Sequence, residues 1–162
     1  MKKYKVPPIP GSVWRNPLHF IAFGFGAGAL PVMPGTFGTL VGVGIYWLLQ
    51  MFLAPWVYFF VVLACVMLSM WICEKVSSDI AVQDHQGMCL DEIVGFLVTM
   101  LFVPFSWMAV ILGFVLFRVF DIVKPWPINM IDEKVHGGVG MVLDDVVAGI
   151  FSCALLHIIK II

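Results

Sequence analysis

The chain has 162 residues, a length that suits one domain and is short for two. Hydrophobic residues make up 62% of the chain and charged residues only 12%, against about 25% in a typical soluble domain. A soluble chain of this size could not bury so much apolar surface, so the composition excludes an ordinary soluble protein and indicates an integral membrane protein. The net charge is −1, and the basic residues form no patch suited to nucleic acid.

The whole chain, residues 1–162, is predicted to form one membrane-embedded domain with a basic, proline-rich tail at residues 1–17. Residues 18–33 are apolar, but glycines interrupt them and they are shorter than the ~20 residues that a span needs. This stretch is predicted to be an interfacial or re-entrant helix. Two strong spans follow at 36–53 and 56–73, joined by a tight uncharged turn.

The second half of the chain is predicted to contribute three further crossings. Pro104 divides a long apolar block, and a proline at that distance favours two helices, 91–103 and 105–124. A loop at 125–138 precedes a final helix from about residue 140. The predicted fold is therefore an all-α integral membrane protein, a helical bundle with about five membrane-crossing helices plus the N-terminal interfacial or re-entrant helix.

Charged residues are confined to a few segments, and this predicts the orientation of the chain. All ten acids and nine bases fall within residues 2–15, 74–92, 118–134, 144–145 and 160. If residues 18–33 do not cross, the positive-inside rule places three charged segments in the cytoplasm. They are the basic tail, the polar segment 74–92 and the segment 118–138. The uncharged turns near residues 55 and 104 then lie outside. Lys160 is the exception, and it can snorkel to the far interface.

Five carboxylates from three predicted helices reach one depth, just inside the cytoplasmic interface: Asp91, Glu92, Asp121, Asp144 and Asp145. Helix capping would explain the first two, and pairing with a nearby base would explain Asp121. Asp144 and Asp145, adjacent in the last helix and flanked by apolar residues, are not explained by capping alone, since a cap does not need two neighbouring carboxylates. Like charges at one depth repel one another, and Mg²⁺, a hard cation that takes oxygen ligands, reverses that repulsion.

A Mg²⁺ site is therefore predicted, with the ligands Glu92, Asp121, Asp144 and Asp145. Two glycines suit such a site, because Gly95 follows Glu92 by three residues and Gly149 follows Asp145 by four. Small residues at this spacing keep one helix face free for close packing.

Phosphate-binding features accompany the acids. Arg118 and Lys124 are predicted to hold a phosphate, with Asp121 facing the metal. Glycine turns before helices attract phosphate, and two are present: "HGGVG" with Gly137 and Gly138, and "PGTFGT" with Thr36 and Thr39. His136 has a side chain suited to donate a proton to a leaving oxygen; the alternative is a loop histidine without a role.

Three stretches together resemble the bacterial phosphatidylglycerophosphatase A family: "DEIVG" (91–95), "FRVFDIVKPWP" (117–127) and "HGGVGMVLDDVVAG" (136–149). A fourth, "GAGALPVMPGTFGTL" (26–40), is similar to the N-terminal signature of that family, although Thr39 stands where many relatives have serine. The resemblance places all five acids in the acidic motifs of the family, and Arg118 and Lys124 in its basic motif.

The resemblance implies a Mg²⁺-dependent lipid phosphatase of the bacterial inner membrane. It would hydrolyse the phosphomonoester of phosphatidylglycerophosphate at the cytoplasmic face, giving phosphatidylglycerol and phosphate, with no obligate protein partner. The alternative from another class is a small divalent-cation or proton-coupled transporter, because intramembrane acids also mark ion paths. A transporter predicts acids near the middle of the bilayer. The sequence leaves open whether water or an aspartate attacks phosphorus.

Overall fold

The computed structural model describes residues 8–83 and 85–159, and these residues form helices with no strand. The all-α prediction is confirmed over this part of the chain. Much of the basic tail and the exceptional Lys160 lie outside the described residues. In chain order the elements are two 3₁₀ helices, η1 (Gly11–Trp14) and η2 (Gly24–Ala29), and seven α-helices: α1 (Pro17–Ala22), α2 (Pro34–Phe52), α3 (Pro55–Ile80), α4 (Leu90–Thr99), α5 (Trp107–Val123), α6 (Ile128–Lys134) and α7 (Gly137–Ile159).

Three helices, α2, α3 and α7, are long and apolar enough to cross a membrane. The predicted number of about five crossings is not confirmed. Helix α4 has 10 residues, which at about 1.5 Å per residue is half of a hydrocarbon core about 30 Å thick. Helix α5 has 17 residues and falls just short of a full span. The predicted break near Pro104 is confirmed, because α4 ends before it and α5 begins after it.

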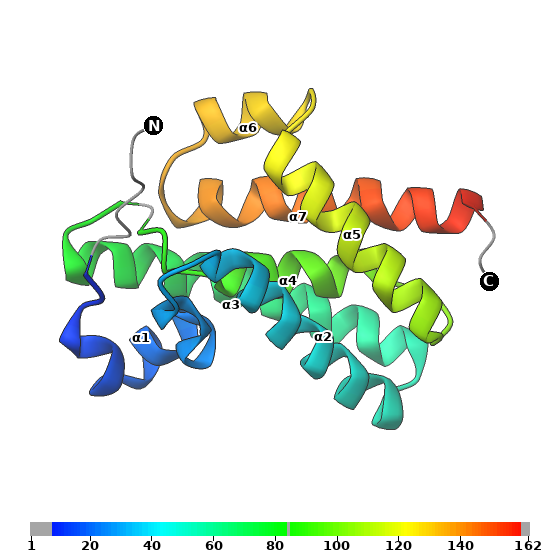
Figure 1. The fold of residues 1–162 in the computed structure, drawn as a ribbon, viewed down its shortest axis with the longest axis horizontal. Coiled ribbons are helices and arrows are strands. Elements are labelled where there is room, and N and C mark those ends of the chain that lie inside the picture. The colour runs from blue at the N-terminus through cyan, green and yellow to red at the C-terminus, as the bar shows by residue number, and fades with distance from the viewer. Residues whose placement is uncertain (1–7, 84, 160–162) are drawn as a thin grey trace.

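Helix α4 is the central helix of the bundle. It contacts α2, α3, α5 and α7, and every residue of it except the first-turn pair Asp91 and Glu92 is buried. A short helix is tolerated at this depth because neighbouring protein, and not lipid, surrounds its ends. In Figure 1, α4 lies between α7 and α2. The first turn of α4 therefore presents its two acids inside the bundle.

Three local predictions differ from the structure. Residues 18–33 form α1 and then η2 in place of one helix, since Phe25 and Gly26 take positive φ values of 58° and 92°, which an α-helix cannot contain. Helix α3 runs on to Ile80, into the segment predicted to be polar loop. The predicted loop at 125–138 contains the short helix α6.

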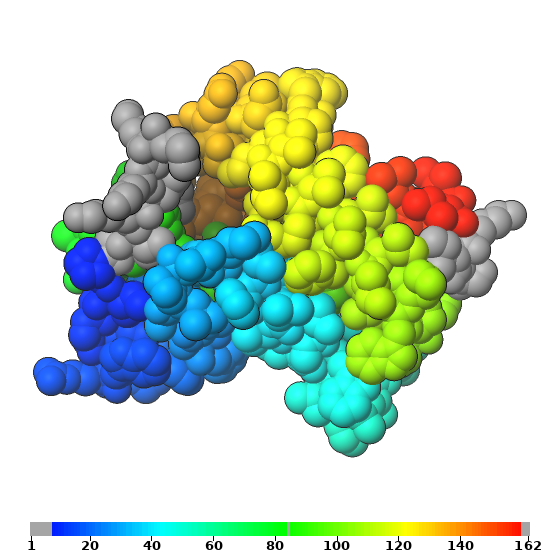
Figure 2. Space-filling model, viewed as in Figure 1, coloured from blue at the N-terminus to red at the C-terminus, as the bar shows by residue number. Residues whose placement is uncertain are grey.

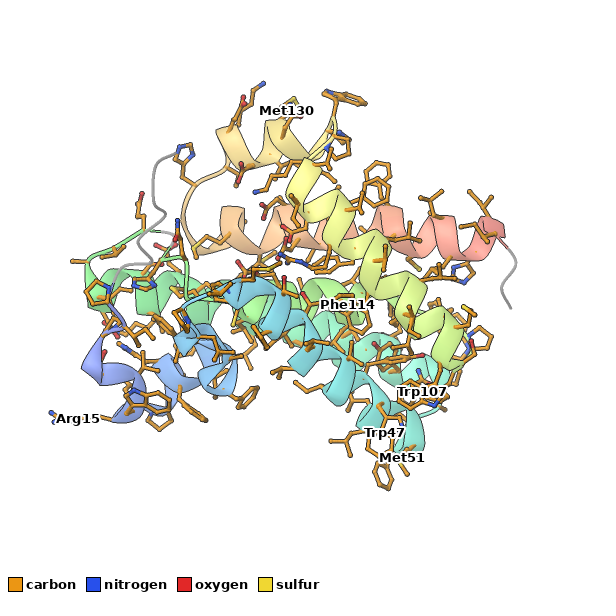
Figure 3. The ribbon with its side chains drawn as sticks, in the orientation of Figure 1. Arg15, Trp47, Met51, Trp107, Phe114 and Met130 are labelled. Carbon is orange, nitrogen blue, oxygen red and sulfur yellow. The ribbon has the colours of Figure 1, made fainter. Side chains whose placement is uncertain are left out.

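Exposed tryptophans lie at both ends of the bundle. The α2–α3 turn, the start of α5 and the end of α7 lie together on the right of Figure 1, and Figure 3 shows Trp47, Met51 and Trp107 at that end. These three side chains are exposed, as is Trp56 in the first turn of α3. At the opposite end the exposed Trp126 follows α5. Exposed tryptophans at both ends are typical of the aromatic belts of membrane proteins.

Candidate active site

A cavity of about 780 Å³ opens at the charged end of the bundle. Its walls come from the start of α2, the loop after α3, the start of α4, the end of α5, α6 and the start of α7. In Figure 2 the beginning of α2 and the end of α5 border a hollow, and the first part of α7 is visible at its floor. All five acids of the sequence prediction line this cavity, together with Arg118 and Lys124.

Three carboxylates form the closest group in the cavity. Asp91, Glu92 and Asp145 each offer an oxygen, and these atoms lie within 4.8 Å of one another. Asp91 and Glu92 stand in the first turn of α4, where Asp91 Oδ1 accepts a hydrogen bond of 3.1 Å from the backbone N–H of Glu92. Asp145 lies about two turns into α7 and is only 4% exposed. The group therefore joins two helices that are far apart in the sequence.

Glycines bring α4 and α7 together beside this group. A Cβ atom on Gly149 would lie 2.5 Å from the carbonyl oxygen of Gly95, and one on Gly95 would lie 2.9 Å from the carbonyl oxygen of Asp145. Cβ atoms do not approach carbonyl oxygens this closely, so only glycine permits this approach. The predicted role of both glycines in close helix packing is confirmed, and the approach sets the distance between Asp145 and the acids of α4.

Arg118 of α5 faces the same acids. Its Nη1 lies 2.5 Å from Asp121 Oδ2, one helical turn away, and 3.9 Å from Glu92 Oε1. Arg118 Nε and Glu92 Oε2 are buried and have no hydrogen-bond partner among the described residues. Buried polar atoms are rarely left unpaired, and unpaired ones call for a bound water, ion or ligand. Gly35, in the first turn of α2, packs against both side chains.

Lys124 belongs to a second charged group. Its Nζ donates hydrogen bonds of 2.7 Å to Asp144 Oδ2 on α7 and of 2.7 Å to Asp132 Oδ1 on α6. Burial lowers the pKa of Lys124, but the two hydrogen bonds and the charges of both aspartates outweigh it and raise that pKa above the ordinary value. The raised pKa favours the protonated, cationic form of Lys124 at neutral pH. The two bases that the sequence analysis assigned to one phosphate line the same cavity but pair with different acids.

The remaining predicted residues divide between the cavity and its surroundings. Thr36, His136 and Gly137 line the cavity. Thr39 is fully buried outside the lining, and its hydroxyl donates a hydrogen bond to the carbonyl of Gly35. Gly138 is also outside the lining, and its N–H donates to Glu74 Oε2 of α3. The first turn of α7 therefore directs at least this N–H to a carboxylate of the protein.

Sequence reasoning missed three contributions to this cavity. Asp91 was not among the predicted metal ligands, although it belongs to the closest group of carboxylates. Gly35 was not named as a site residue, although it lies in the first turn of α2 and packs against Glu92 and Arg118. Asp132 was not singled out, because it lies in a predicted loop where an exposed acid is common. Only the contact of α6 with α7 shows that it faces Lys124.

The fold and the cavity define a class of protein. A helical membrane protein with buried carboxylates, an arginine and a lysine at one membrane face is suited to bind a metal cation and a phosphate together. A helix N-terminus, that of α2, also borders the cavity and favours anions. These properties are typical of a membrane enzyme that acts on phosphate esters.

Comparison with known proteins identifies the family. The family model of phosphatidylglycerophosphatase A matches residues 20–160. The chain is 41% identical over 146 residues to phosphatidylglycerophosphatase A of Escherichia coli, covering 89% of this chain and 84% of that protein. It is 36% identical over 146 residues to phosphatidylglycerophosphatase A of Haemophilus influenzae, covering 90% of each. The chain belongs to the phosphatidylglycerophosphatase A family, and it is an enzyme.

A further relative carries a different name. A putative phosphatidylinositol-3-phosphatase of Bacteroides thetaiotaomicron is 36% identical over 148 residues, covering 86% of this chain and 91% of that protein. No solved structure matches the chain.

Proposed function

We propose that this protein is a Mg²⁺-dependent phosphatase that converts phosphatidylglycerophosphate to phosphatidylglycerol and phosphate at the cytoplasmic face of the bacterial inner membrane. The observation that carries the proposal is the contact between Arg118 and the carboxylates of Asp121 and Glu92 inside one cavity, next to the group that Glu92 forms with Asp91 and Asp145. The names of the two phosphatidylglycerophosphatase relatives supply the substrate.

The donor set fits Mg²⁺. Asp91, Glu92 and Asp145 offer hard oxygen ligands from a small region, and Glu92 Oε2 is buried without a partner among the described residues. The cluster contains no nitrogen or sulfur ligand that would favour zinc. When bound, Mg²⁺ would neutralise the carboxylates and stabilise the negative charge that develops on the phosphoryl group.

The residues of this chain have separate tasks in the proposed reaction. The guanidinium of Arg118 binds phosphoryl oxygens as a planar fork, and Asp121 orients that guanidinium from one turn away. Asp145 and the acids of α4 would hold the metal. His136 lines the cavity and is exposed, so it can exchange protons with water and donate one to the glycerol oxygen as the bond to phosphorus breaks.

Exposed apolar residues on the rim of the cavity favour a lipid substrate. Val32 and Met33, in the loop before α2, and Ile122, near the end of α5, line the cavity and are 63%, 59% and 65% exposed. Apolar side chains beside an acid cluster are unfavourable in water, but they suit the acyl chains of a lipid whose phosphate reaches Arg118. A transporter is not favoured, because the acids gather at one end of the bundle with a base and a helix N-terminus.

The direct test is phosphate release by the purified protein in detergent micelles that contain phosphatidylglycerophosphate. We expect release with Mg²⁺, none with excess chelator, and recovery when Mg²⁺ is restored. Glycerol 3-phosphate, which lacks acyl chains, is expected to be a much poorer substrate. Full release in excess chelator would contradict the metal requirement, and the absence of release under all conditions would contradict the proposed activity.

The proposed orientation can be tested with single cysteines. Ser78, at the exposed end of α3, and Asn129 of α6 are on the charged side, whereas Ala54 lies in the exposed turn between α2 and α3 at the other side. In intact cells, an impermeant thiol reagent is expected to label Ala54→Cys and not Ser78→Cys or Asn129→Cys. All three should be labelled after the membrane is permeabilised. The reverse pattern in intact cells would show that the cavity faces outward.

A further inference from the structure

Among the described residues, Arg118 and Lys124 are the arginine and lysine that line the cavity, and each is held by its own pair of acids. Arg118 pairs with Asp121 of its own helix and lies near Glu92 of α4. Lys124, just beyond the end of α5, bridges Asp132 of α6 and Asp144 of α7. Neither of the acids that hold Lys124 belongs to the closest carboxylate group. The two cations therefore form two separate positions for an anion.

The geometry of Lys124 leaves one donor for a ligand. An ammonium group has three N–H donors, and two of them are used by Asp132 and Asp144. All three residues line the cavity, and the side chain of Lys124 is only 30% exposed. Its backbone is in the left-handed region, with φ 44° and ψ 58°, where glycine is the usual residue. A lysine in place of glycine at this position therefore indicates a functional role for its side chain.

The separation of the two cations suits a ligand with two phosphates. Six residues of helix correspond to a rise of about 9 Å, and both side chains are long enough to reduce the distance between their charged ends. Phosphatidylglycerophosphate carries a phosphomonoester and a phosphodiester joined through one glycerol. If Arg118 takes the monoester, as in the proposed function on which this inference rests, the diester lies within reach of the other cation.

We propose that Lys124 binds the phosphodiester of the lipid and that Asp132 is a positioning residue for this interaction. Asp144 is buried and fixed on α7, with a side chain 8% exposed, whereas Asp132 approaches from α6 with a side chain 47% exposed. With both acceptors present the ammonium is held between α6 and α7 at the wall of the cavity, and its third N–H remains for a ligand. With Asp144 alone the ammonium moves toward α7 and away from the ligand.

The test uses Asp132→Asn, with Glu133→Gln as the matched control. Glu133 is the next residue of α6, is exposed, and forms no ion pair within the described residues, so its replacement removes the same charge from the same helix. Two quantities are measured: the KM for phosphatidylglycerophosphate, and the binding of phosphatidylglycerol, the product that retains the diester. Binding is followed by the thermal stabilisation of the purified protein in mixed micelles, with diacylglycerol as the lipid that lacks a phosphate.

In Asp132→Asn we expect the KM for the substrate and the dissociation constant for phosphatidylglycerol each to rise about tenfold, because the neutral amide oxygen is a weaker acceptor than the carboxylate and holds the ammonium less firmly. The kcat should change much less, and the thermal stability without lipid should match that of Glu133→Gln, because an exposed ion pair contributes little to it. Asp132→Glu, which keeps the charge, should recover most of the affinity.

Two results would overturn the proposal. One is an unchanged affinity for phosphatidylglycerol in Asp132→Asn. The other is a fall in kcat at constant KM, which would place Asp132 with the reacting phosphate. The binding measurement needs no turnover, so a wild-type protein that binds phosphatidylglycerol through Lys124 but releases no phosphate would contradict the proposed function alone.

Discussion

Replacing Asp145 by Asn is expected to lower phosphate release by at least about a thousandfold, because a metal ligand that also stabilises the transition state contributes several kcal/mol. Asp145 is buried and is a member of the closest carboxylate group. The neutral amide keeps the shape of the side chain but is a poor ligand for a hard cation. Activity should be measured at saturating lipid and over a wide range of Mg²⁺ concentration.

The same substitution should not weaken the fold. Three carboxylates within 4.8 Å repel one another, so removal of one charge is expected to leave the melting temperature without Mg²⁺ unchanged or higher. Addition of Mg²⁺ should raise the melting temperature of the wild type by mass action and should have little effect on Asp145→Asn. Near-normal turnover in this variant, or an equal response of both proteins to Mg²⁺, would reduce Asp145 to a structural role.

Replacing Gly149 by Ala is expected to lower activity about a hundredfold even though residue 149 is not in the lining of the cavity. The added methyl would lie 2.5 Å from the carbonyl oxygen of Gly95 and 3.1 Å from Val98 Cβ, so α7 must move away from α4. Asp145, one turn before Gly149, would move with α7. Because packing errors of this kind cost about 1–3 kcal/mol, the melting temperature should fall as well.

The matched control for this prediction is Gly44→Ala. Gly44 also lies within a long helix, α2, but a Cβ atom there meets nothing within 4 Å. Alanine is the better helix former by up to about 1 kcal/mol, so this variant should keep its activity and be as stable as the wild type or more stable. Full activity in Gly149→Ala would show that the distance between α4 and α7 does not control the site.

Several features of the fold were determined by the sequence alone. Long apolar runs without charge can only be accommodated as helices in a bilayer, and this predicted both ends of α2 and the starts of α3 and α7 within a few residues of their observed positions. The position of Pro104 predicted the break between α4 and α5. Proline has no backbone N–H to donate to the preceding turn, so a helix usually ends before it. The acids could be assigned to the ends of helices because charged residues interrupt the long apolar runs.

The depth and exposure of each helix were decided by packing. Apolar residues in α4 satisfy the same pattern whether they face lipid or protein, so the sequence could not show that this helix is short and enclosed by four others. The start of α7 depends on packing too. It lies at Gly137, three residues earlier than predicted, where Gly138 packs against the backbone of α3 and its N–H meets Glu74.

Only the tertiary structure decided which charged groups meet. The sequence placed five acids and two bases at one depth, but the rotation of each helix about its axis selects the partners, and that rotation follows from contacts such as Gly95 against Gly149. As a result Asp91 and Glu92 face Asp145, whereas Asp144, the adjacent residue, points about 100° away on the helix and meets Lys124. The sequence pattern therefore specifies which charged residues lie at the end of a helix, and the packing of the helices specifies which residues they contact.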